Sequence, residues 1–336
     1  MASIDGTRNQ PASRIAILAL LALVCLVASA RGADPRADLI LVEGAGGAPE
    51  FTEQFGQWSE RWRQAAESSG VAVISIGGPR AAEDKQSPSD RDLLRQAIQR
   101  QLVPSERPLW IVLLGHGTDD RRDARFNLAG PDISAKELAG ELKDCQRPLA
   151  VLCCFSASAP FLNELSGPGR MVVAATRSGA EHNFSRFGGY LAEAIGGDLT
   201  ADLDKDGQTS LLEAFLLASK QTQDFYADEN RLATEHALLD DNGDQRGTPA
   251  DWFHGIRPVK SPKDGAMDGL LASRRVFVPG DSERDASPQF LADRDKLEQQ
   301  ISSLRQRKAE LPEDDYYQQL EPLMLQLSKL YESLPQ

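Results

Sequence analysis

Residues 109–118 read LWIVLLGHGT, and residues 149–158 read LAVLCCFSAS. Each stretch begins with an apolar run long enough for a buried strand and ends in small and reactive residues. Three further apolar runs, 38–42, 71–74 and 171–175, alternate with segments of helical spacing at 52–69, 90–102 and 135–143. Near-continuous apolar strands separated by helices are typical of a parallel sheet covered on both faces. We therefore predict an α/β fold whose strands end at one functional edge.

Composition and charge limit the classes of function. The chain has 336 residues, with 37 Lys and Arg against 50 Asp and Glu, and its formal net charge is −13. A protein this acidic is repelled by phosphate backbones, which excludes broad nucleic-acid binding. The fractions of 41% apolar and 26% charged residues are ordinary for a soluble globular protein and exclude a multi-span membrane protein. The length predicts one large domain with an appendage, or two domains.

The N-terminus has the pattern of a secretory signal peptide. Arg8 and Arg14 precede an apolar run at residues 15–27, and the small residues Ala28-Ser29-Ala30 follow it. The run is shorter than the roughly 20 residues that a membrane-spanning helix needs. We expect residues 1–30 to be removed and the protein to be exported, to the periplasm or the medium. Membrane contact is then expected only through this leader; a retained anchor is the alternative.

Reactive side chains follow two of the predicted strands. His116 and Gly117 come after the strand at 109–114, and Cys153 and Cys154 end the strand at 149–152. If these strands are neighbours in a parallel sheet, the imidazole and a thiol meet at the same edge. A thiol beside an imidazole provides a nucleophile and a general acid/base. Gly117 lets a substrate approach closely and can offer its N–H to an oxyanion.

These motifs resemble the clan of caspase-like cysteine peptidases, which includes legumain, caspases, metacaspases and gingipain. The order of strand–His-Gly and strand–Cys is the same, and residues 154–158 (Cys-Phe-Ser-Ala-Ser) are similar to the Cys-aromatic-Ser-Gly pattern of the bacterial legumain-like branch. The resemblance covers about residues 37–257 and implies a caspase-like three-layer sandwich with a mostly parallel sheet, in a peptidase domain at 34–257. Two residues depart from the pattern: Ala157 stands where Gly is usual, and Cys153 where a small or acidic residue is commoner.

The choice of nucleophile follows from the motif. Alignment on Phe155-Ser156 implies that Cys154 is the nucleophile, and Cys153 is the less favoured candidate. Side chains alternate along a strand, so the two thiols are expected to point to opposite faces. Two structural alternatives remain: an inert buried Cys at the strand end, and a disulfide between Cys145 and Cys153 in an exported protein. Because Cys25 leaves with the leader, three Cys remain, and an odd number predicts a free thiol.

The resemblance implies acyl transfer on a peptide or protein substrate, without a cofactor for catalysis. The Cys154 thiolate would attack the peptide carbonyl, and the backbone N–H groups of Cys154 and Gly117 would stabilise the oxyanion. His116 would protonate the departing amine, and water would release the acyl group. No third catalytic residue is required.

Substrate preference is expected to depend on residues 176–188, because in this clan the segment after the fifth strand helps to form the pocket for the residue before the scissile bond. The candidate pocket residues are Glu181, Ser185 and Arg186. Glu181 would favour a basic residue there and Arg186 an acidic one. The alternative for both charged residues is an ordinary solvated surface position.

Residues 202–213 read DLDKDGQTSLLE and match the twelve-residue EF-hand loop. The expected ligands are Asp202, Asp204, Asp206, the backbone carbonyl of Gln208, and Glu213. Oxygen ligands without His or Cys favour Ca²⁺ over zinc or copper. A capping box, Ser210-x-x-Glu213, fits the same residues and is compatible with calcium, because the outgoing helix begins there. A second acidic loop at 240–244 lacks a matching distal Glu, so a turn is the favoured interpretation there.

The C-terminal part has a different composition. Residues 258–286 are interrupted by Pro and Gly and are predicted to be a linker. Residues 287–336 carry two leucine stripes around a break at Pro312, which predicts an α-helical hairpin with a coiled-coil-like seam. The hairpin is expected to be a packing appendage; a surface for a partner or for self-association is the alternative.

Two functions follow from these observations. The first is an exported cysteine endopeptidase with a Cys-His dyad, stabilised by calcium. The second is a catalytically inactive caspase-like module for binding or assembly in the cell envelope.

Overall fold

The computed structural model describes residues 36–78, 87–197, 200–260, 262–263, 265–284 and 286–334. The expected signal peptide lies outside the described residues. Among those that are described, no helix combines the length and the apolar character needed to cross a membrane.

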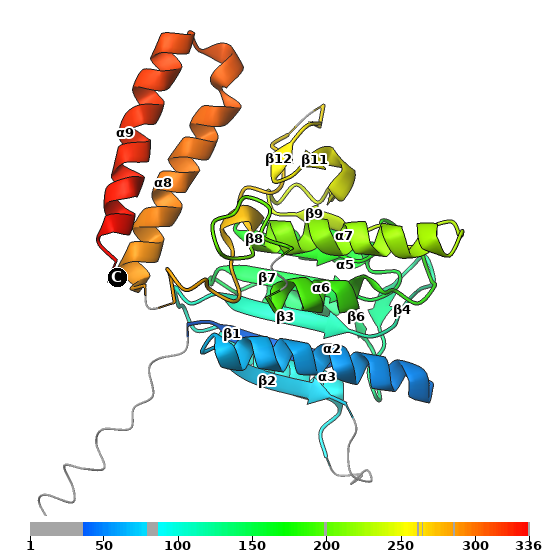
Figure 1. Ribbon diagram of the computed structural model, residues 1–336. Coiled ribbons are helices and arrows are strands. Elements are labelled where there is room, and N and C mark those ends of the chain that lie inside the picture. Colours follow the sequence, from blue (N-terminus) through cyan, green and yellow to red (C-terminus); the bar gives the residue numbers. More distant parts are fainter. Residues whose placement is uncertain are drawn as a thin grey trace, which may run out of the picture. The chain divides into compact units, whose positions relative to one another are not determined.

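A seven-stranded sheet forms the centre of the molecule (Figure 1), in the order β10-β9-β8-β7-β3-β1-β2. Its strands are β1 (Asp38–Glu43), β2 (Ala72–Gly77), β3 (Leu109–Leu114), β7 (Leu149–Cys154), β8 (Arg170–Ala174), β9 (Leu238–Asp240) and β10 (Thr248–Pro249). Five neighbouring strands pair in parallel, namely β2, β1, β3, β7 and β8. At one edge of the sheet, β9 and β10 add antiparallel pairs. β1, β3 and β7 are buried along their whole length because both of their faces are covered.

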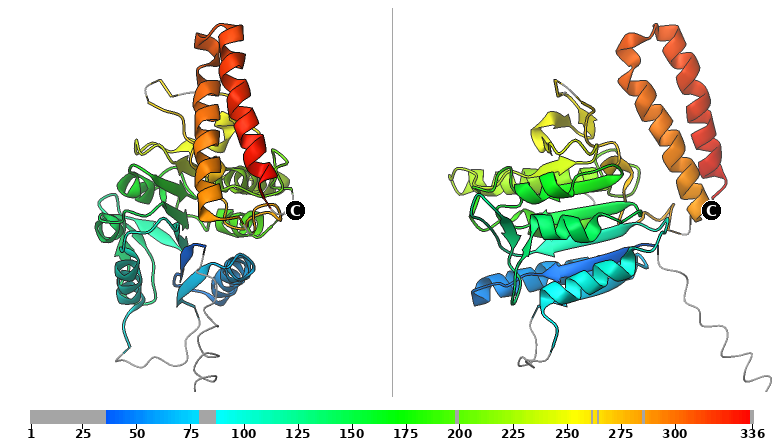
Figure 2. Two further views of the ribbon diagram at one scale, coloured as in Figure 1. Left: turned by 90° about the vertical axis from the view of Figure 1, so that its left-hand side faces the viewer. Right: turned by 180° about the vertical axis from the view of Figure 1, so that it is seen from behind.

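Helices cover both faces of the sheet (Figure 2), each closing its own apolar core. One layer contains α2 (Pro49–Ser68), α6 (Phe187–Ile195) and α7 (Leu211–Asp228); the other contains α3 (Asp90–Gln101), α4 (Ala135–Leu142) and α5 (Ala159–Leu165). The expected α/β sandwich around a mostly parallel sheet is therefore confirmed. Capping boxes begin two of these helices, with Ser134 and Glu137 at α4 and with Ser210 and Glu213 at α7.

Short elements complete the domain. They are β4 (Gly117–Asp119), β5 (Ala124–Phe126) and β6 (Ile133–Ser134) in a small antiparallel sheet, the pair β11 (Phe253–His254) and β12 (Arg257–Pro258), and the 3₁₀ turns η1 (Ala250–Trp252) and η2 (Ala272–Arg274). β4 begins at Gly117, three residues after the end of β3 at Leu114. The small sheet thus begins at the edge of the central sheet where the candidate catalytic residues lie.

The segment expected to be a linker, residues 258–286, contributes to the core. Phe277 is buried and makes edge-to-face contacts with Trp62 and Trp110, with ring centroids 5.1 Å apart in each case. Val276 forms an isolated antiparallel bridge with Ser210 at the start of α7. Residues 265–280 of this segment, named the strap, place apolar side chains beside α2. The segment that its Pro and Gly content predicted to be a linker is thus irregular but packed.

The C-terminal residues form two helices in contact, α8 (Pro288–Gln306) and α9 (Glu313–Glu332), joined through η3 (Lys308–Glu310). Ile301, Leu304 and Tyr316 are buried between or beside them. This is the α-helical hairpin that the leucine spacing predicted. A polar cluster lies at its base, where the buried carboxylate of Glu283 pairs with Arg294 and accepts a hydrogen bond from Tyr331 at 2.7 Å.

Candidate active site

The structure makes β3 and β7 neighbours and brings their reactive ends to one edge of the sheet. Their register pairs Leu114 with Cys154, the last residue of each strand. Leu114 and Cys154 belong to the core beneath α2 and α6. The His116 ring, two residues beyond Leu114, contacts Phe51 and Phe55 of α2. The imidazole and the Cys154 thiol therefore lie on the same face of the sheet, at the ends of adjacent strands.

Cys154 is fully enclosed in this structure. A side-chain carbon placed on Gly188 would lie only 2.7 Å from the Cβ of Cys154, so α6 begins directly against this residue. Burial raises the pKa of the Cys154 thiol far above its usual range, and the resting side chain is therefore the protonated thiol. Gly188 allows this close approach because any larger residue would collide with Cys154.

Cys153 points into the opposite core, as strand alternation predicts. It is completely buried, and both burial and the neighbouring Cys154 raise the pKa of its thiol. Cys145, Cys153 and Cys154 are all free thiols, so the alternative disulfide does not form in this structure.

An aromatic cover, defined as Phe51, Phe55, Trp58 and Phe184, surrounds the candidate imidazole. Edge contacts join the His116 ring to Phe51 at 4.9 Å, Phe55 at 5.1 Å and Phe184 at 6.0 Å between centroids. Phe184 also stacks on Phe51 at 4.8 Å. Burial lowers the pKa of His116, and a hydrogen bond with the backbone of Gly46 offsets this in part. The imidazole is accordingly neutral near pH 7.

The predicted oxyanion donor, the Gly117 N–H, is engaged in this structure. It donates to the Ser156 hydroxyl at 3.1 Å, and this hydroxyl donates to the carbonyl oxygen of Gly117 at 3.1 Å. A side-chain carbon on Gly117 would lie 2.3 Å from the backbone oxygen of Ser156 and 2.4 Å from the Phe155 ring. Glycine is thus required here for close packing of the two motif loops, whatever role its N–H has in binding.

Ala157 occupies a left-handed backbone conformation, with φ of 57°. Only glycine adopts such a φ without an energetic cost. This explains why glycine is typical at this position of the Cys-aromatic-Ser-Gly pattern. The N–H of Ala157 donates to the carbonyl of Glu181 at 2.8 Å. The turn after Cys154 is thereby joined to the segment that follows β8, where the substrate pocket is expected.

Glu181 has intramolecular partners. Its carboxylate accepts from the backbone of Arg177 at 2.9 Å, forms an ion pair with the Arg177 guanidinium at 3.3 Å, and contacts Nδ1 of His236 at 2.6 Å. The backbone N–H of His236 donates to it as well. The Glu181 side chain therefore holds this segment against the chain that precedes β9.

Ser185 and Arg186 lie at the start of α6, beside a residue that sequence reasoning missed. The buried Glu235 accepts from the Ser185 hydroxyl at 2.6 Å and from the backbone N–H groups of Arg186 and Phe187 at 3.0 and 3.2 Å. The carboxylate thus satisfies the free amides of the first helical turn. No sequence motif surrounds Glu235. Only the structure reveals its position, through hydrogen bonds to residues that are distant in the sequence.

The guanidinium of Arg186 stacks over two aromatic rings, Phe225 at 4.1 Å and Phe184 at 5.4 Å. Among the described residues no carboxylate forms an ion pair with it. The positive charge of Arg186 is therefore held next to the aromatic cover by ring contacts, and the buried Glu235 carboxylate bonds to the Arg186 backbone N–H rather than to its guanidinium.

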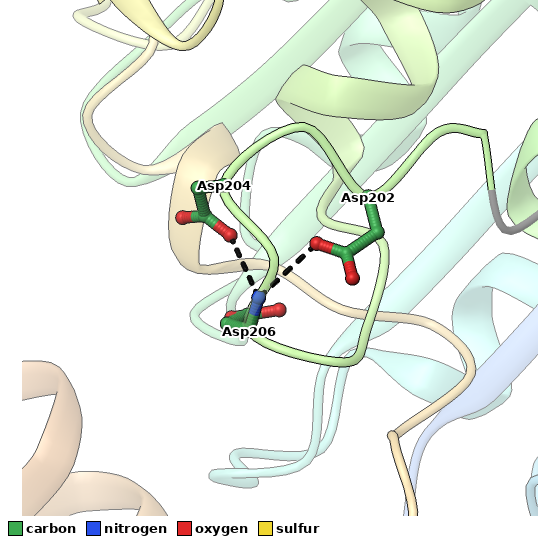
Figure 3. Close-up of side chains that lie close together, drawn as sticks. All are labelled: Asp202, Asp204 and Asp206. Carbon is green, nitrogen blue, oxygen red and sulfur yellow. Dashed lines mark hydrogen bonds between the residues drawn. The ribbon is translucent and has the colours of Figure 1, made fainter.

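Three of the five residues expected to bind calcium lie close together in the acidic loop (Figure 3). Asp202, Asp204 and Asp206 each place one carboxylate oxygen within 4.8 Å of the others. The N–H groups of Asp206 and Gly207 donate to the Asp202 carboxylate at 3.1 Å each. Burial and neighbouring acids raise the pKa of Asp206 to about 6. The three carboxylates thus form a concentrated negative charge with hard oxygen donors, which suits a divalent cation.

The other two residues expected to provide ligands, Gln208 and Glu213, make hydrogen bonds within the protein. Glu213 is buried at the start of α7, where its carboxylate accepts from the N–H groups of Leu203 at 2.8 Å and Ser210 at 2.8 Å. The side chain of Gln208 turns toward Gly280, whose N–H donates to it at 3.4 Å. The capping box and the loop coexist in these residues, with the Glu213 carboxylate bonded to the loop backbone.

Two surface hollows lie away from the candidate dyad. One is lined by α2 and α6 residues that include Arg61 and Glu193, and the other by residues of η2 and α8 that include Arg275 and Asp295. Neither is lined by Cys154 or His116.

No protein-family model matches this sequence, and no curated protein does. Among solved structures, the chain is similar to the Drosophila initiator caspase Dronc, with a TM-score of 0.42 and 12% identity over 63% of this chain and 82% of that one. It is also similar to caspase-1 from Spodoptera frugiperda, with a TM-score of 0.39 and 9% identity over 62% and 86% of the two chains.

Proposed function

We propose that this protein is an exported cysteine endopeptidase of the caspase-like clan, with Cys154 as the nucleophile and His116 as the general acid/base. The observation that carries the proposal is the placement of both residues on one face of the sheet, at the ends of the adjacent strands β3 and β7. Motif order belongs to the resemblance and strand adjacency is required by the chemistry, and this chain has both.

The reaction proceeds by acyl transfer. His116 takes the proton of the Cys154 thiol, and the thiolate forms a bond to the peptide carbonyl carbon. The carbonyl oxygen becomes an oxyanion that accepts hydrogen bonds from the N–H groups of Cys154 and Gly117. When the C–N bond breaks, His116 gives its proton to the departing amine. Water then attacks the thioester with His116 as the base, and the carboxylic acid leaves as the Cys154 thiol re-forms.

The enclosed thiol supports the interpretation of this conformation as a resting state. α6 packs against Cys154, which is fully buried, and Ser156 holds the Gly117 N–H. On this proposal, substrate entry displaces Phe184, whose ring contacts His116 and whose segment also carries the candidate pocket residues. Opening exposes the thiol to solvent, which lowers its pKa toward the ordinary range and permits thiolate formation.

For the substrate, we propose an acidic residue before the scissile bond. The guanidinium of Arg186 has no acidic partner among the described residues, whereas the Glu181 carboxylate is occupied by Arg177 and His236. Peptides that differ only in Asp or Arg at this position test the preference. Substitution Arg186→Gln should raise KM for the Asp peptide, and an enzyme that prefers the Arg peptide would assign the pocket to Glu181 instead.

A covalent peptide probe that reacts with thiols tests the nucleophile. The wild type and a Cys145→Ala control should both be labelled, and Cys154→Ala should lose labelling and peptide hydrolysis together. Labelling that survives Cys154→Ala would contradict the assignment. Absence of both labelling and hydrolysis in the wild type, with and without Ca²⁺, would favour the alternative of an inactive binding or assembly module.

We further propose that the loop at 202–213 binds a structural Ca²⁺ ion. The approach of Asp202, Asp204 and Asp206 to within 4.8 Å supports it, with the Gln208 carbonyl and Glu213 as the other ligands. Bound Ca²⁺ would stabilise the fold, so thermal unfolding with Ca²⁺ should occur at a higher temperature than with chelator. Asp204→Asn should abolish the difference at this loop. A Ca²⁺-independent melting temperature in the wild type would contradict the proposal.

Export is proposed from the leader pattern at residues 1–30 and is tested by the mature N-terminus. Protein recovered from the periplasm or the medium should begin shortly after Ala30. A mature protein that retains residues 15–27 would indicate the membrane anchor instead.

A further inference from the structure

Residues 240–245 form a loop whose backbone repeats the loop at 202–207. Each has an acid at its first position and oxygen-bearing side chains at its third and fifth positions. Each also has positive φ at its fourth and sixth positions: Lys205 (65°), Gly207 (89°), Gly243 (80°) and Gln245 (67°). In the second loop the N–H of Asp244 donates to Asn242 at 2.8 Å and that of Arg246 to Asp244 at 2.9 Å.

The first residue of this second loop provides an independent observation. Asp240 is only 1% exposed, and its Oδ1 accepts from the N–H of Gly243 at 3.0 Å, which turns the carboxylate toward the loop. Its other oxygen, Oδ2, is enclosed and receives no hydrogen bond from any described residue. The Ser166 hydroxyl and the backbone N–H groups of Gly243 and Gln245 lower the pKa of this carboxyl by hydrogen bonding, which burial outweighs. Oδ2 is the oxygen that none of these donors reaches in hydrogen-bonding geometry.

A buried carboxylate oxygen without a donor is energetically costly and needs an explanation. No Lys or Arg among the described residues forms an ion pair with Asp240 or Asp244. The neighbouring acid Asp241 already has partners. Its carboxylate accepts hydrogen bonds from the N–H groups of Gly269, Leu271 and Ala272, around the start of η2. A bound cation would supply the missing positive charge at Oδ2.

We propose that residues 240–246 form a second divalent-cation site that favours Ca²⁺. Its ligands are Asp240 Oδ2, the side-chain oxygens of Asn242 and Asp244, and the backbone carbonyl of Arg246. These are hard oxygen donors, which Ca²⁺ prefers. The twelfth position of this loop is Asp251, whose exposed carboxylate pairs with Lys260 at 2.6 Å. Water therefore completes the coordination, and the affinity is lower than that of a loop closed by a buried Glu.

This site has a structural consequence for the strap at 265–280. The N–H groups of Asp241 and Asn242 in the loop donate to the buried Asp268 of the strap at 2.9 and 3.1 Å. In return, the N–H of Gly269 in the strap donates to the Asp241 carboxylate. Gly280, at the other end of the strap, contacts the loop at 202–213. A cation in each loop would hold one end of the segment that leads to the helical hairpin.

Calorimetric titration of the full chain with CaCl₂, after removal of bound metal, tests the second site. The wild type should bind two Ca²⁺ ions, Asp204→Asn and Asp244→Asn one each, and the double variant none. Asp244→Asn keeps an oxygen that can accept from Arg246, so the loop can still fold, which a circular dichroism spectrum should verify. Asp251→Asn, at the twelfth position, is the matched control and should retain both ions.

The alternatives give different patterns. If Asp244→Asn binds as many ions as the wild type, the second site does not exist. If the wild type binds one ion and loses it with Asp204→Asn, only the loop at 202–213 is a calcium site. If the ion lost with Asp244→Asn is the sole one bound, the second site stands and the proposal for the first loop fails.

Discussion

Ser156 and Gly117 form a reciprocal pair between the two motif loops. The Ser156 hydroxyl accepts from the Gly117 N–H and donates to the Gly117 carbonyl, both at 3.1 Å, and both residues are buried. The N–H that the proposed reaction directs to an oxyanion is thus held in this structure by the second residue after Cys154. One hydroxyl joins the loop that carries His116 to the loop that follows Cys154.

Substitution Ser156→Ala should destabilise the fold, because it leaves a buried N–H and a buried C=O without partners. A buried unsatisfied group costs about 1–3 kcal/mol. Unfolding in urea, followed by circular dichroism, measures the loss. The exposed Ser303 of α8 provides the control, and Ser303→Ala should change the free energy of unfolding by less than about 0.5 kcal/mol. Equal stability of Ser156→Ala and the wild type would contradict the structural role of the pair.

Ala157→Gly should stabilise the protein. The left-handed conformation of Ala157 costs an L-residue roughly 1–2 kcal/mol, whereas glycine adopts it freely and loses roughly 0.5–1 kcal/mol through its greater chain entropy. The net expectation is a gain of up to about 1.5 kcal/mol in the free energy of unfolding.

The same substitution in a helix gives a control of opposite sign. Ala139→Gly in the middle of α4 should lower the stability by about 1 kcal/mol. If Ala157→Gly is destabilising to a similar extent, the positive φ of Ala157 does not represent strain.

The positions of the catalytic candidates could be predicted because they depend on local patterns. Each reactive residue follows a continuous apolar run, and parallel strands place their carboxyl ends at one edge of a sheet. The strand order supplied the remaining condition, since β3 and β7 are adjacent although they are separated by β4, β5, β6 and α4 in the chain. The helical hairpin was also predictable, because its leucine spacing is a local property.

The environment of the site could not be predicted in the same way. Ser185 and Glu235 are bonded across 50 residues, and neither belongs to a motif. Phe277 lies in a stretch rich in Pro and Gly, yet it packs between two tryptophans that are distant in sequence. Such contacts depend on the assembled shape of the chain. Local periodicity detects elements, and it does not detect a single side chain that an irregular segment inserts into a core.

Removal of the aromatic cover should increase the reactivity of Cys154. Phe184 contacts Phe51, Phe55 and Trp58 as well as His116, and each aromatic pair is worth about 0.5–1.5 kcal/mol. If Phe184→Ala lowers the free energy of opening by about 1.4 kcal/mol, iodoacetamide should alkylate Cys154 about ten times faster. Alkylation is measured in a Cys145→Ala background, by mass spectrometry of the Cys154 peptide.

Phe225 offers a matched control for this experiment. It stacks with Arg186 as Phe184 does, but no contact joins it to His116 in the described structure. Phe225→Ala should therefore leave the alkylation rate close to that of the wild type. Equal acceleration by both substitutions would indicate general destabilisation and would count against a specific cover.

The carboxyl of Glu298, at the base of the hairpin, should make the stability of the protein depend on pH. Burial raises the pKa of this carboxyl to about 7; Asp295 and Glu283 act in the same direction, and Arg294 and Arg274 oppose them. The folded state therefore holds a proton that the unfolded state, with an ordinary pKa near 4.5, releases. Stability falls as the pH rises from about 4.5 to about 7 and is lowest, for this group, above that range.

Glu298→Gln removes the ionisation and keeps the shape of the side chain. The variant should melt at least about 2 °C higher than the wild type at pH 8, which corresponds to roughly 1 kcal/mol for a domain of this size. At pH 4 the two proteins should melt together, because Glu298 is then neutral in both states. The exposed Glu321 of α9 is the control, and Glu321→Gln should show no such pH-dependent gain. A gain of equal size at pH 4 and pH 8 would show that packing, and not burial of a charge, distinguishes the variant.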